Sequence, residues 1–144
     1  MPAGASPTTP LLGRSMDLLW LYRRAAAAAE PGTRVVLDEG AQTLSALVAD
    51  LRATTDAAQP QWRQVPARWR RQVQCRATAG AMRAAANPRR AWLHTLGRRD
   101  AALLGAFEAA AARARPGTAR LIDRQLPRLQ ELYLDMYQLV GRAT

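Results

Sequence analysis

Apolar residues recur at helical spacing along the stretch from Thr118 to Arg142. Ile122, Leu129 and Met136 repeat every seven residues, and further apolar rows run beside them. Arginines occupy the opposite side at intervals of four residues, with aspartates and glutamates near them. This pattern predicts an amphipathic helix with one wide apolar face, which neighbouring helices must cover.

The same pattern occurs earlier in the chain. It begins at the tripeptide Pro31-Gly32-Thr33, which returns as Pro116-Gly117-Thr118, and at this offset of 85 residues the apolar positions coincide. The matched pairs are Val36 and Leu121, Leu37 and Ile122, Leu44 and Leu129, Leu47 and Leu132, Val48 and Tyr133, and Leu51 and Met136. An alanine-rich run precedes each Pro-Gly. Each half therefore predicts a helical hairpin, with glycine ending one helix and threonine capping the next.

Two hairpins with one apolar face each predict an all-α fold, an antiparallel four-helix bundle. Chance recurrence of Pro-Gly-Thr in an alanine- and arginine-rich chain is the alternative. The length of 144 residues suits one domain. Residues 1–13, with three prolines, predict a flexible tail, and residues 14–144 predict a single helical-bundle domain whose first helix is capped by Ser15. Gly40, inside the second predicted helix, indicates close packing against a neighbour.

Residues 57–99 form a basic connecting segment between the hairpins. The segment has ten arginines and no acidic residue, so the whole formal net charge of +10 lies within it. A helix is predicted from Pro66 to Ala86, and Asn87-Pro88 should end it. A short helical piece is predicted to follow and to end at Gly97. Asp100 is then expected to cap the next helix. The best apolar stripe of the first of these helices is Trp69, Val73, Ala77, Gly80 and Ala84.

Arginines interleaved with tryptophans can neutralise phosphates and stack on bases. They can also meet an acidic protein or the anionic surface of a membrane. All 21 basic residues are arginine, which indicates a composition bias, so a solvated arginine face with the tryptophans in the core is the alternative interpretation. The residues of the candidate anion-binding surface are Arg68, Arg70, Arg71, Arg89, Arg90, Arg98 and Arg99.

The sequence offers no catalytic or metal-binding motif. One cysteine, Cys75, and one histidine, His94, exclude an internal disulfide and the usual zinc sets within one chain, and no Glu-x-x-His pair for a di-iron centre is present. A buried structural role is expected for Cys75 and a structural role for His94. No cofactor is predicted. The chain has no signal-peptide pattern and no apolar run long enough to span a bilayer, which favours the cytoplasm, and a homo-oligomer is left open.

Several short motifs occur in an order that resembles an uncharacterised bacterial family of ferritin-like four-helix-bundle proteins. The motifs are residues 33–51, Ala79-Gly80-Ala81-Met82-Arg83 followed by residues 92–96, Gly97-Arg98-Arg99-Asp100, and Leu121-Ile122-Asp123-Arg124-Gln125-Leu126. The resemblance implies a ferritin-like bundle and supplies no catalytic residues. The arm over residues 100–115 is about ten residues shorter than in that family and lacks its acidic cluster.

Three functions are consistent with these features. The first is a non-enzymatic interaction or stress-related scaffold whose arginine surface meets an anionic partner. The second is a ferritin-like metal-binding or redox protein. The third is a helical chaperone or adaptor, in which a partner protein covers the apolar stripe over residues 66–86.

Overall fold

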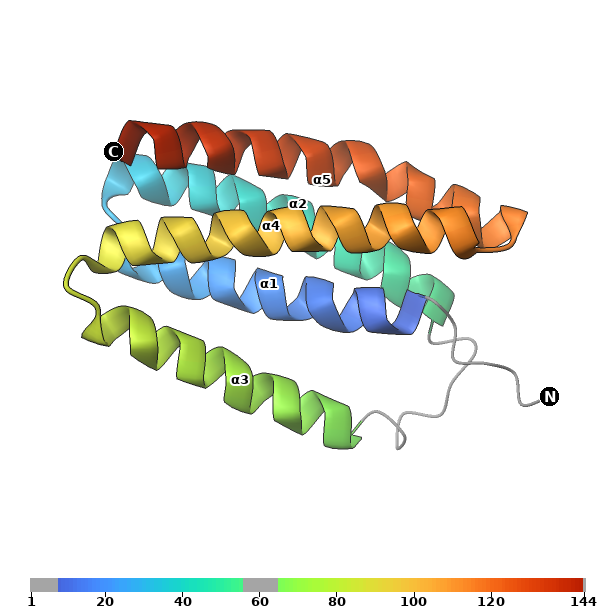
Figure 1. Ribbon diagram of the computed structural model, residues 1–144, viewed down its shortest axis with the longest axis horizontal. Coiled ribbons are helices and arrows are strands. Elements are labelled where there is room, and N and C mark those ends of the chain that lie inside the picture. The colour runs from blue at the N-terminus through green and yellow to red at the C-terminus, as the bar shows by residue number, and fades with distance from the viewer. Residues whose placement is uncertain (1–7, 56–64, 144) are drawn as a thin grey trace.

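The computed structural model describes residues 8–55 and 65–143, which form five α-helices (Figure 1). Their bounds are α1 Thr8–Ala28, α2 Pro31–Thr55, α3 Val65–Ala84, α4 Pro88–Arg113 and α5 Pro116–Ala143. The predicted all-α fold is confirmed. None of the described helices is both long enough and apolar enough to cross a membrane.

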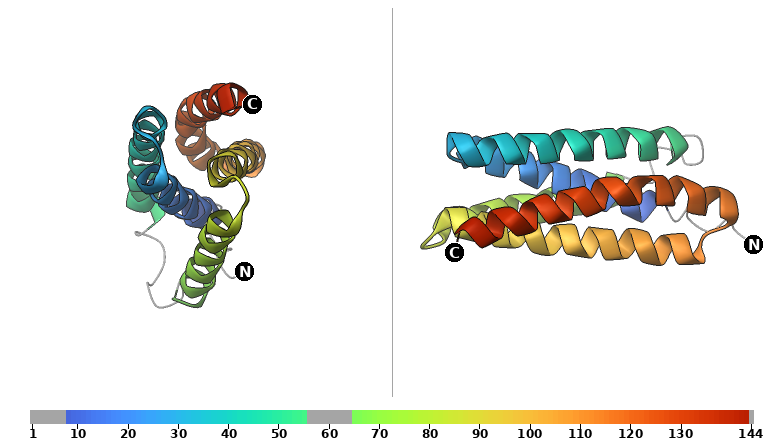
Figure 2. Two further views of the ribbon diagram at one scale, coloured as in Figure 1. Left: turned by 90° about the vertical axis from the view of Figure 1, so that its left-hand side faces the viewer. Right: turned by 90° about the horizontal axis from the view of Figure 1, so that it is seen from above.

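The two predicted hairpins are confirmed: α1 packs along α2, and α4 packs along α5. Contacts of α1 with α4 and of α2 with α5 join the hairpins into a ring of four helices, in which neighbours run antiparallel (Figures 1 and 2). The helices α2 and α4 run in the same direction, so α3 must carry the chain back along the bundle. It does so on the outside, against α1 and α4 (Figure 2).

The predicted register of the repeat is also confirmed. Leu37 and Ile122 are buried at matched positions, as are Leu44 and Leu129. The offset of 85 residues also relates α1 to α4, which the sequence pattern had not indicated. Buried Leu11, Ser15, Leu18 and Tyr22 match buried Leu96, Asp100, Leu103 and Phe107. The two halves thus contribute equivalent faces to one core.

The prediction of a flexible tail over residues 1–13 is wrong for residues 8–13, and residues 1–7 lie outside the described part. The first helix begins at Thr8, and Leu11 and Leu12 are buried in the core. Pro10 fits the first turn because the N–H that it lacks would have no helical partner there. Ser15 is therefore not a cap. Its hydroxyl donates to the Leu11 carbonyl oxygen at 2.7 Å, inside the helix.

The predicted threonine caps are wrong as well. Pro31 and Pro116 are themselves the first residues of α2 and α5, positions for which the fixed φ of proline is well suited. Thr33 is buried within α2. No glycine in the described residues has a positive φ, so the glycine of each tripeptide is part of a helix rather than its end.

The helix α4 is continuous where two pieces were predicted. Asn87 caps it by accepting a hydrogen bond from the Arg90 N–H at 3.2 Å. Gly97 does not interrupt the helix, and it faces Met136 of α5, where a Cβ atom would make ordinary contact at 3.6 Å. Asp100 lies in the middle of α4 and is buried, so it is not a cap.

Gly40 confirms the close packing expected of it. A Cβ atom there would lie 2.5 Å from Cε1 of Tyr22 and 3.1 Å from Cδ1 of Leu132. Because Gly40 of α2 has no side chain, the Tyr22 ring can pack directly against the α2 backbone at this level of the core.

Candidate anion-binding site

The basic helix α3 packs through a narrow face of small side chains. Cys75 and Ala79 are buried, and Thr78 and Met82 are half-buried beside them. The predicted apolar stripe therefore lies on the face of α3 that points away from the bundle. Its members Val73, Ala77, Gly80 and Ala84 are exposed, and the side chain of Trp69 lies outside the described part.

Charge explains this orientation. Arg70, Arg76 and Arg83 border the predicted stripe, so packing through that stripe would bring all three against the bundle. Of the described arginines of α3, Arg71 lies on the Cys75 face, four residues before Cys75, and it meets a carboxylate there. The helix therefore buries the face with the smaller desolvation cost.

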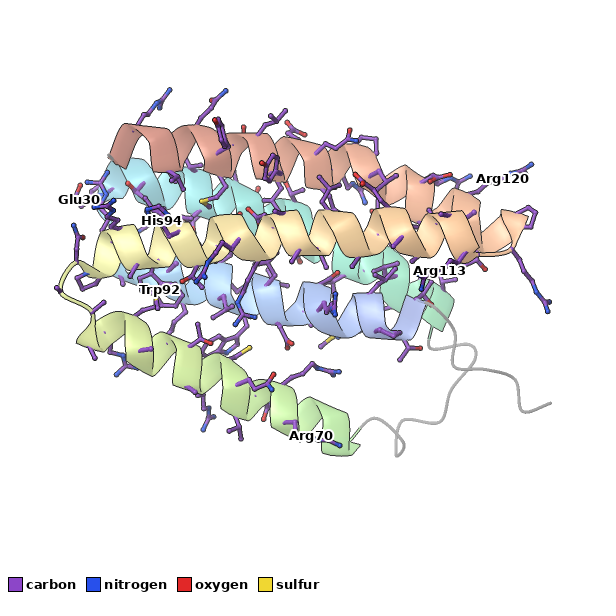
Figure 3. All side chains as sticks on the ribbon, in the orientation of Figure 1. Glu30, Arg70, Trp92, His94, Arg113 and Arg120 are labelled. Carbon is purple, nitrogen blue, oxygen red and sulfur yellow. The ribbon has the colours of Figure 1, made fainter. Side chains whose placement is uncertain are left out.

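The candidate arginines fall into two groups, one at the end of the bundle where α4 begins and one along α3 and the middle of α4. Arg70 lies near the start of α3, whereas Glu30 and His94 mark the opposite end (Figure 3). At that opposite end Arg89 pairs with Glu30 at 3.4 Å and donates to the Thr33 hydroxyl at 3.5 Å. Arg90 donates from Nε to Nε2 of the exposed His94 at 3.4 Å. Arg89 and Arg90 thus make local contacts around the start of α4.

The other candidates lie along α3 and the middle of α4. Arg70 and Arg98 are exposed, and Arg71 is half-buried. The side chain of Arg68 lies outside the described part. Arg99 donates to the Thr78 hydroxyl at 3.3 Å, which links α4 to α3. Of the six candidates whose side chains the structure describes, Arg71 and Arg99 approach one shared carboxylate, whereas Arg89 and Arg90 make their contacts at the start of α4.

That carboxylate belongs to Asp17 of α1, which the sequence did not single out. Arg71 Nε lies 3.6 Å from Asp17 Oδ1. Burial raises the pKa of the Asp17 carboxyl above its usual value of 3.8, although the Arg71 and Arg99 guanidinium groups oppose that shift. No local pattern marks Asp17, because its arginine neighbours come from two distant helices.

Two clefts flank Asp17. One of about 170 Å³ lies between α1 and α3 and includes Trp20, Arg71 and Cys75. The other, of about 290 Å³, lies between α1 and α4 and includes Arg14 and Arg99. Arg14 was also missed by sequence reasoning, since it lies in α1, far from the basic segment.

Cys75 is buried in the junction of α3 with α1. Its Sγ lies 4.0 Å from the Asp17 carbonyl oxygen, to which the thiol donates. Burial, with the Asp17 charge, raises the pKa of the thiol to about 11. The group is therefore a neutral thiol at physiological pH, and the expected buried structural role is confirmed.

Of the tryptophans of the basic segment, the structure describes the side chain of Trp92, which is not on the surface. Trp92 is buried in the core, and Trp62 lies outside the described residues. Trp20 of α1 is exposed, and the Arg24 guanidinium lies over its ring at 5.9 Å. Stacking of nucleic-acid bases on Trp92 is thereby excluded in this structure.

A second polar feature is buried in the bundle core. The Tyr22 hydroxyl donates to Oδ2 of Asp100 at 2.6 Å, while Oδ1 of Asp100 has no hydrogen-bond partner among the described residues. Burial raises the pKa of the Asp100 carboxyl to about 8, and burial together with Asp100 raises the pKa of Tyr22 well above 10.0. Among the described residues no three side chains of His, Cys, Asp or Glu gather to form a metal-ligand set.

Comparison of the chain with known protein families, with curated proteins and with solved structures gives no match.

Proposed function

We propose that the chain is a non-enzymatic interaction scaffold, in which the four-helix core carries α3 as a basic surface for an anionic macromolecule. The one-sided packing of α3 carries this proposal. Cys75 and Ala79 attach the helix to the bundle, while Arg70, Arg76 and Arg83 are exposed. The helix contains no acidic residue, so nothing along it neutralises these charges. Guanidinium groups are well suited to phosphate and carboxylate partners.

A nucleic acid is the partner to test first, because counterion release makes its binding steeply dependent on salt. We would measure the anisotropy of labelled single- and double-stranded oligonucleotides across a salt series. Each engaged phosphate contributes a log–log slope of about −0.7 to −0.9. Vesicles with and without anionic lipid, run in parallel, would distinguish a membrane surface from a nucleic acid.

Matched variants decide whether α3 is responsible. Replacing Arg70, Arg76 and Arg83 by glutamine should flatten the salt slope and weaken binding. The control replaces the exposed Arg120, Arg124 and Arg142 of α5 by glutamine, the same change in net charge. Equal losses of affinity in the two triple variants would mean that binding depends on net charge and not on α3. Absence of binding at low salt would contradict the proposal of a nucleic-acid partner.

A protein adaptor is the second candidate, and the exposed stripe on α3 favours it. Val73 is 51% exposed, and Ala77 and Gly80 beside it are also exposed. These residues resemble a helix face that another helix could approach closely. If the oligonucleotides and the vesicles fail to bind, Val73→Asp should improve the solubility of the isolated protein, because it removes this apolar face from water. Unchanged solubility would count against the adaptor.

The ferritin-like resemblance is supported by one feature, the single return segment between two hairpins, which is typical of such bundles. A metal-binding or redox role would need further ligands around Asp100, the buried carboxyl to which Tyr22 donates. Metal analysis of the purified protein tests that role. We place the protein in the cytoplasm, where Cys75 would remain reduced.

A further inference from the structure

Three arginines from three helices line the two clefts beside one carboxylate, Asp17, at the junction of α1, α3 and α4. Arg14 and Arg99 line the wider cleft together with Asp17. Arg71 pairs with Asp17 from the neighbouring cleft. When Asp17 is ionised, these four side chains carry two positive charges in excess.

Two of these guanidinium groups are held by contacts around the junction. A Cβ atom on Gly13 of α1 would lie 2.6 Å from Nη1 of Arg71 and 3.0 Å from its Cζ. Glycine inside a helix is destabilising relative to alanine, and here it leaves the space in which Arg71 lies. Arg99 is held in turn by its hydrogen bond to Thr78 of α3. Arg71 and Arg99 are therefore positioned by contacts within the protein.

We propose that this junction binds a phosphate group in its dianionic form, between Arg14 and Arg99 with Arg71 beside them. Two excess positive charges match a phosphate monoester, which carries a charge near −2 above its second pKa of about 6. Inorganic phosphate has a higher second pKa and is mostly a dianion at the pH of the titration below. A phosphodiester within a nucleic acid carries a single charge. Arginine forks from different helices can contact several phosphate oxygens at once.

The centre of the site differs from the surface of the proposed function. Arg14 and Arg99 lie in the cleft between α1 and α4, whereas Arg70 and Arg83 are exposed on α3. Arg76 is the residue of that surface nearest the site, because it lines the neighbouring cleft with Arg71. Either proposal can fail without the other, because different variants test them.

Calorimetric titration of the full chain with inorganic phosphate at pH 7.5, at constant ionic strength, tests the site. Arg14→Gln and Arg99→Gln should each weaken binding about tenfold or more, since each removes a charge-assisted hydrogen-bond donor. Arg120→Gln, the same change on α5 across the bundle from α3 (Figure 3), should bind like the unmodified chain. Asp17→Asn should strengthen binding severalfold, because it removes the competing carboxylate.

The increase expected for Asp17→Asn guards against misfolding as an explanation of the losses. Binding should also weaken at pH 5, where phosphate becomes a monoanion. Equal losses in Arg120→Gln and Arg14→Gln would overturn the proposal, as would weaker binding by Asp17→Asn. Failure of phosphate to bind at millimolar concentration would do the same.

Two labelled oligonucleotides distinguish the sources of the phosphate group. If the natural ligand is a terminal phosphate of a nucleic acid, a 5′-phosphorylated oligonucleotide should bind more tightly than its unphosphorylated form, and inorganic phosphate should compete for the difference. If the ligand is a small phosphorylated molecule, the two oligonucleotides should bind alike while inorganic phosphate still titrates the junction.

Discussion

The four-helix core and α3 differ in what they bury. The largest fully buried side chains, including Tyr22, Leu44 and Phe107, all come from α1, α2, α4 and α5 in the described residues. Among its described side chains, the helix α3 contributes Cys75 and Ala79 to the interior. Large apolar side chains supply most of the free energy of burial, so the core supports the fold and α3 depends on it. A helix with so small a share in the core can carry charge without weakening the bundle.

Asp100 is the exception to the apolar core, and it provides the prediction with the largest effect. The pKa of its carboxyl is about 8 in the folded protein against 3.8 for the free group. Between these values the folded state holds a proton that the unfolded state has released. The free energy of unfolding should therefore fall as the pH rises from about 4 to about 8, by about 1.4 kcal/mol per pH unit for one proton.

Urea denaturation at pH 5 and pH 8 measures this effect. Asp100→Asn cannot ionise, so its stability should depend much less on pH over this range, and it should be the more stable protein at pH 8. Asp123→Asn, an exposed aspartate on α5, is the control and should retain the pH dependence of the unmodified chain. The same pH dependence in Asp100→Asn would show that another group holds the proton.

A matched pair of truncations tests the contrast between the core and the outer face of α3. Leu44 of α2 is fully buried, so Leu44→Ala should lower the free energy of unfolding by about 2–5 kcal/mol. Val73 of α3 is 51% exposed, so Val73→Ala should change it by no more than about 0.5 kcal/mol. Chemical denaturation monitored by circular dichroism measures both. A large loss in Val73→Ala would mean that this face is covered in solution.

Two glycines give a smaller and opposite pair of effects. Gly40→Ala would place a methyl group against the Tyr22 ring and should cost about 1–3 kcal/mol by overpacking. A Cβ atom on Gly80 of α3 meets nothing within 4 Å. Gly80→Ala should therefore stabilise its helix by about 0.5–1 kcal/mol, through propensity alone. The melting temperature should fall in Gly40→Ala and rise in Gly80→Ala. A lower melting temperature for Gly80→Ala would contradict the exposure of this face of α3.

The same contrast explains how much could be predicted from the sequence. In α2 and α5 the apolar rows are long and the faces wide, so periodicity alone gave the hairpins and the buried positions Leu44 and Leu129. In α3 the helix was predicted, but its apolar residues lie on two faces. The cost of burying Arg70, Arg76 and Arg83 disfavours one face, and the Asp17 carboxylate, which pairs with Arg71, favours the other.

The candidate site was less predictable for a related reason. The pattern of charge along the chain indicated Arg71 and Arg99, but it also indicated Arg89 and Arg90, which make local contacts. The charges that complete the junction come from α1, where Arg14 and Asp17 belong to an ordinary helical pattern. Their roles follow from the tertiary position of α3, on which the local sequence carries no signal.

The smallest predicted effect concerns the attachment of α3. The ion pair between Arg71 and Asp17 is partly exposed, with 28% and 23% of the two side chains accessible. Such pairs contribute about 0–1 kcal/mol, so Arg71→Gln should barely change the global free energy of unfolding. Because the described side chains of α3 bury little beyond Cys75 and Ala79, Arg71→Gln should accelerate amide hydrogen exchange in α3. Exchange in the other four helices should stay unchanged. Arg83 is an exposed residue of the same helix, so Arg83→Gln should leave the exchange rates of α3 and of the other four helices unchanged. Faster exchange throughout the bundle of Arg71→Gln would mean that α3 is part of the cooperative core, and the separation between core and basic helix would then be wrong.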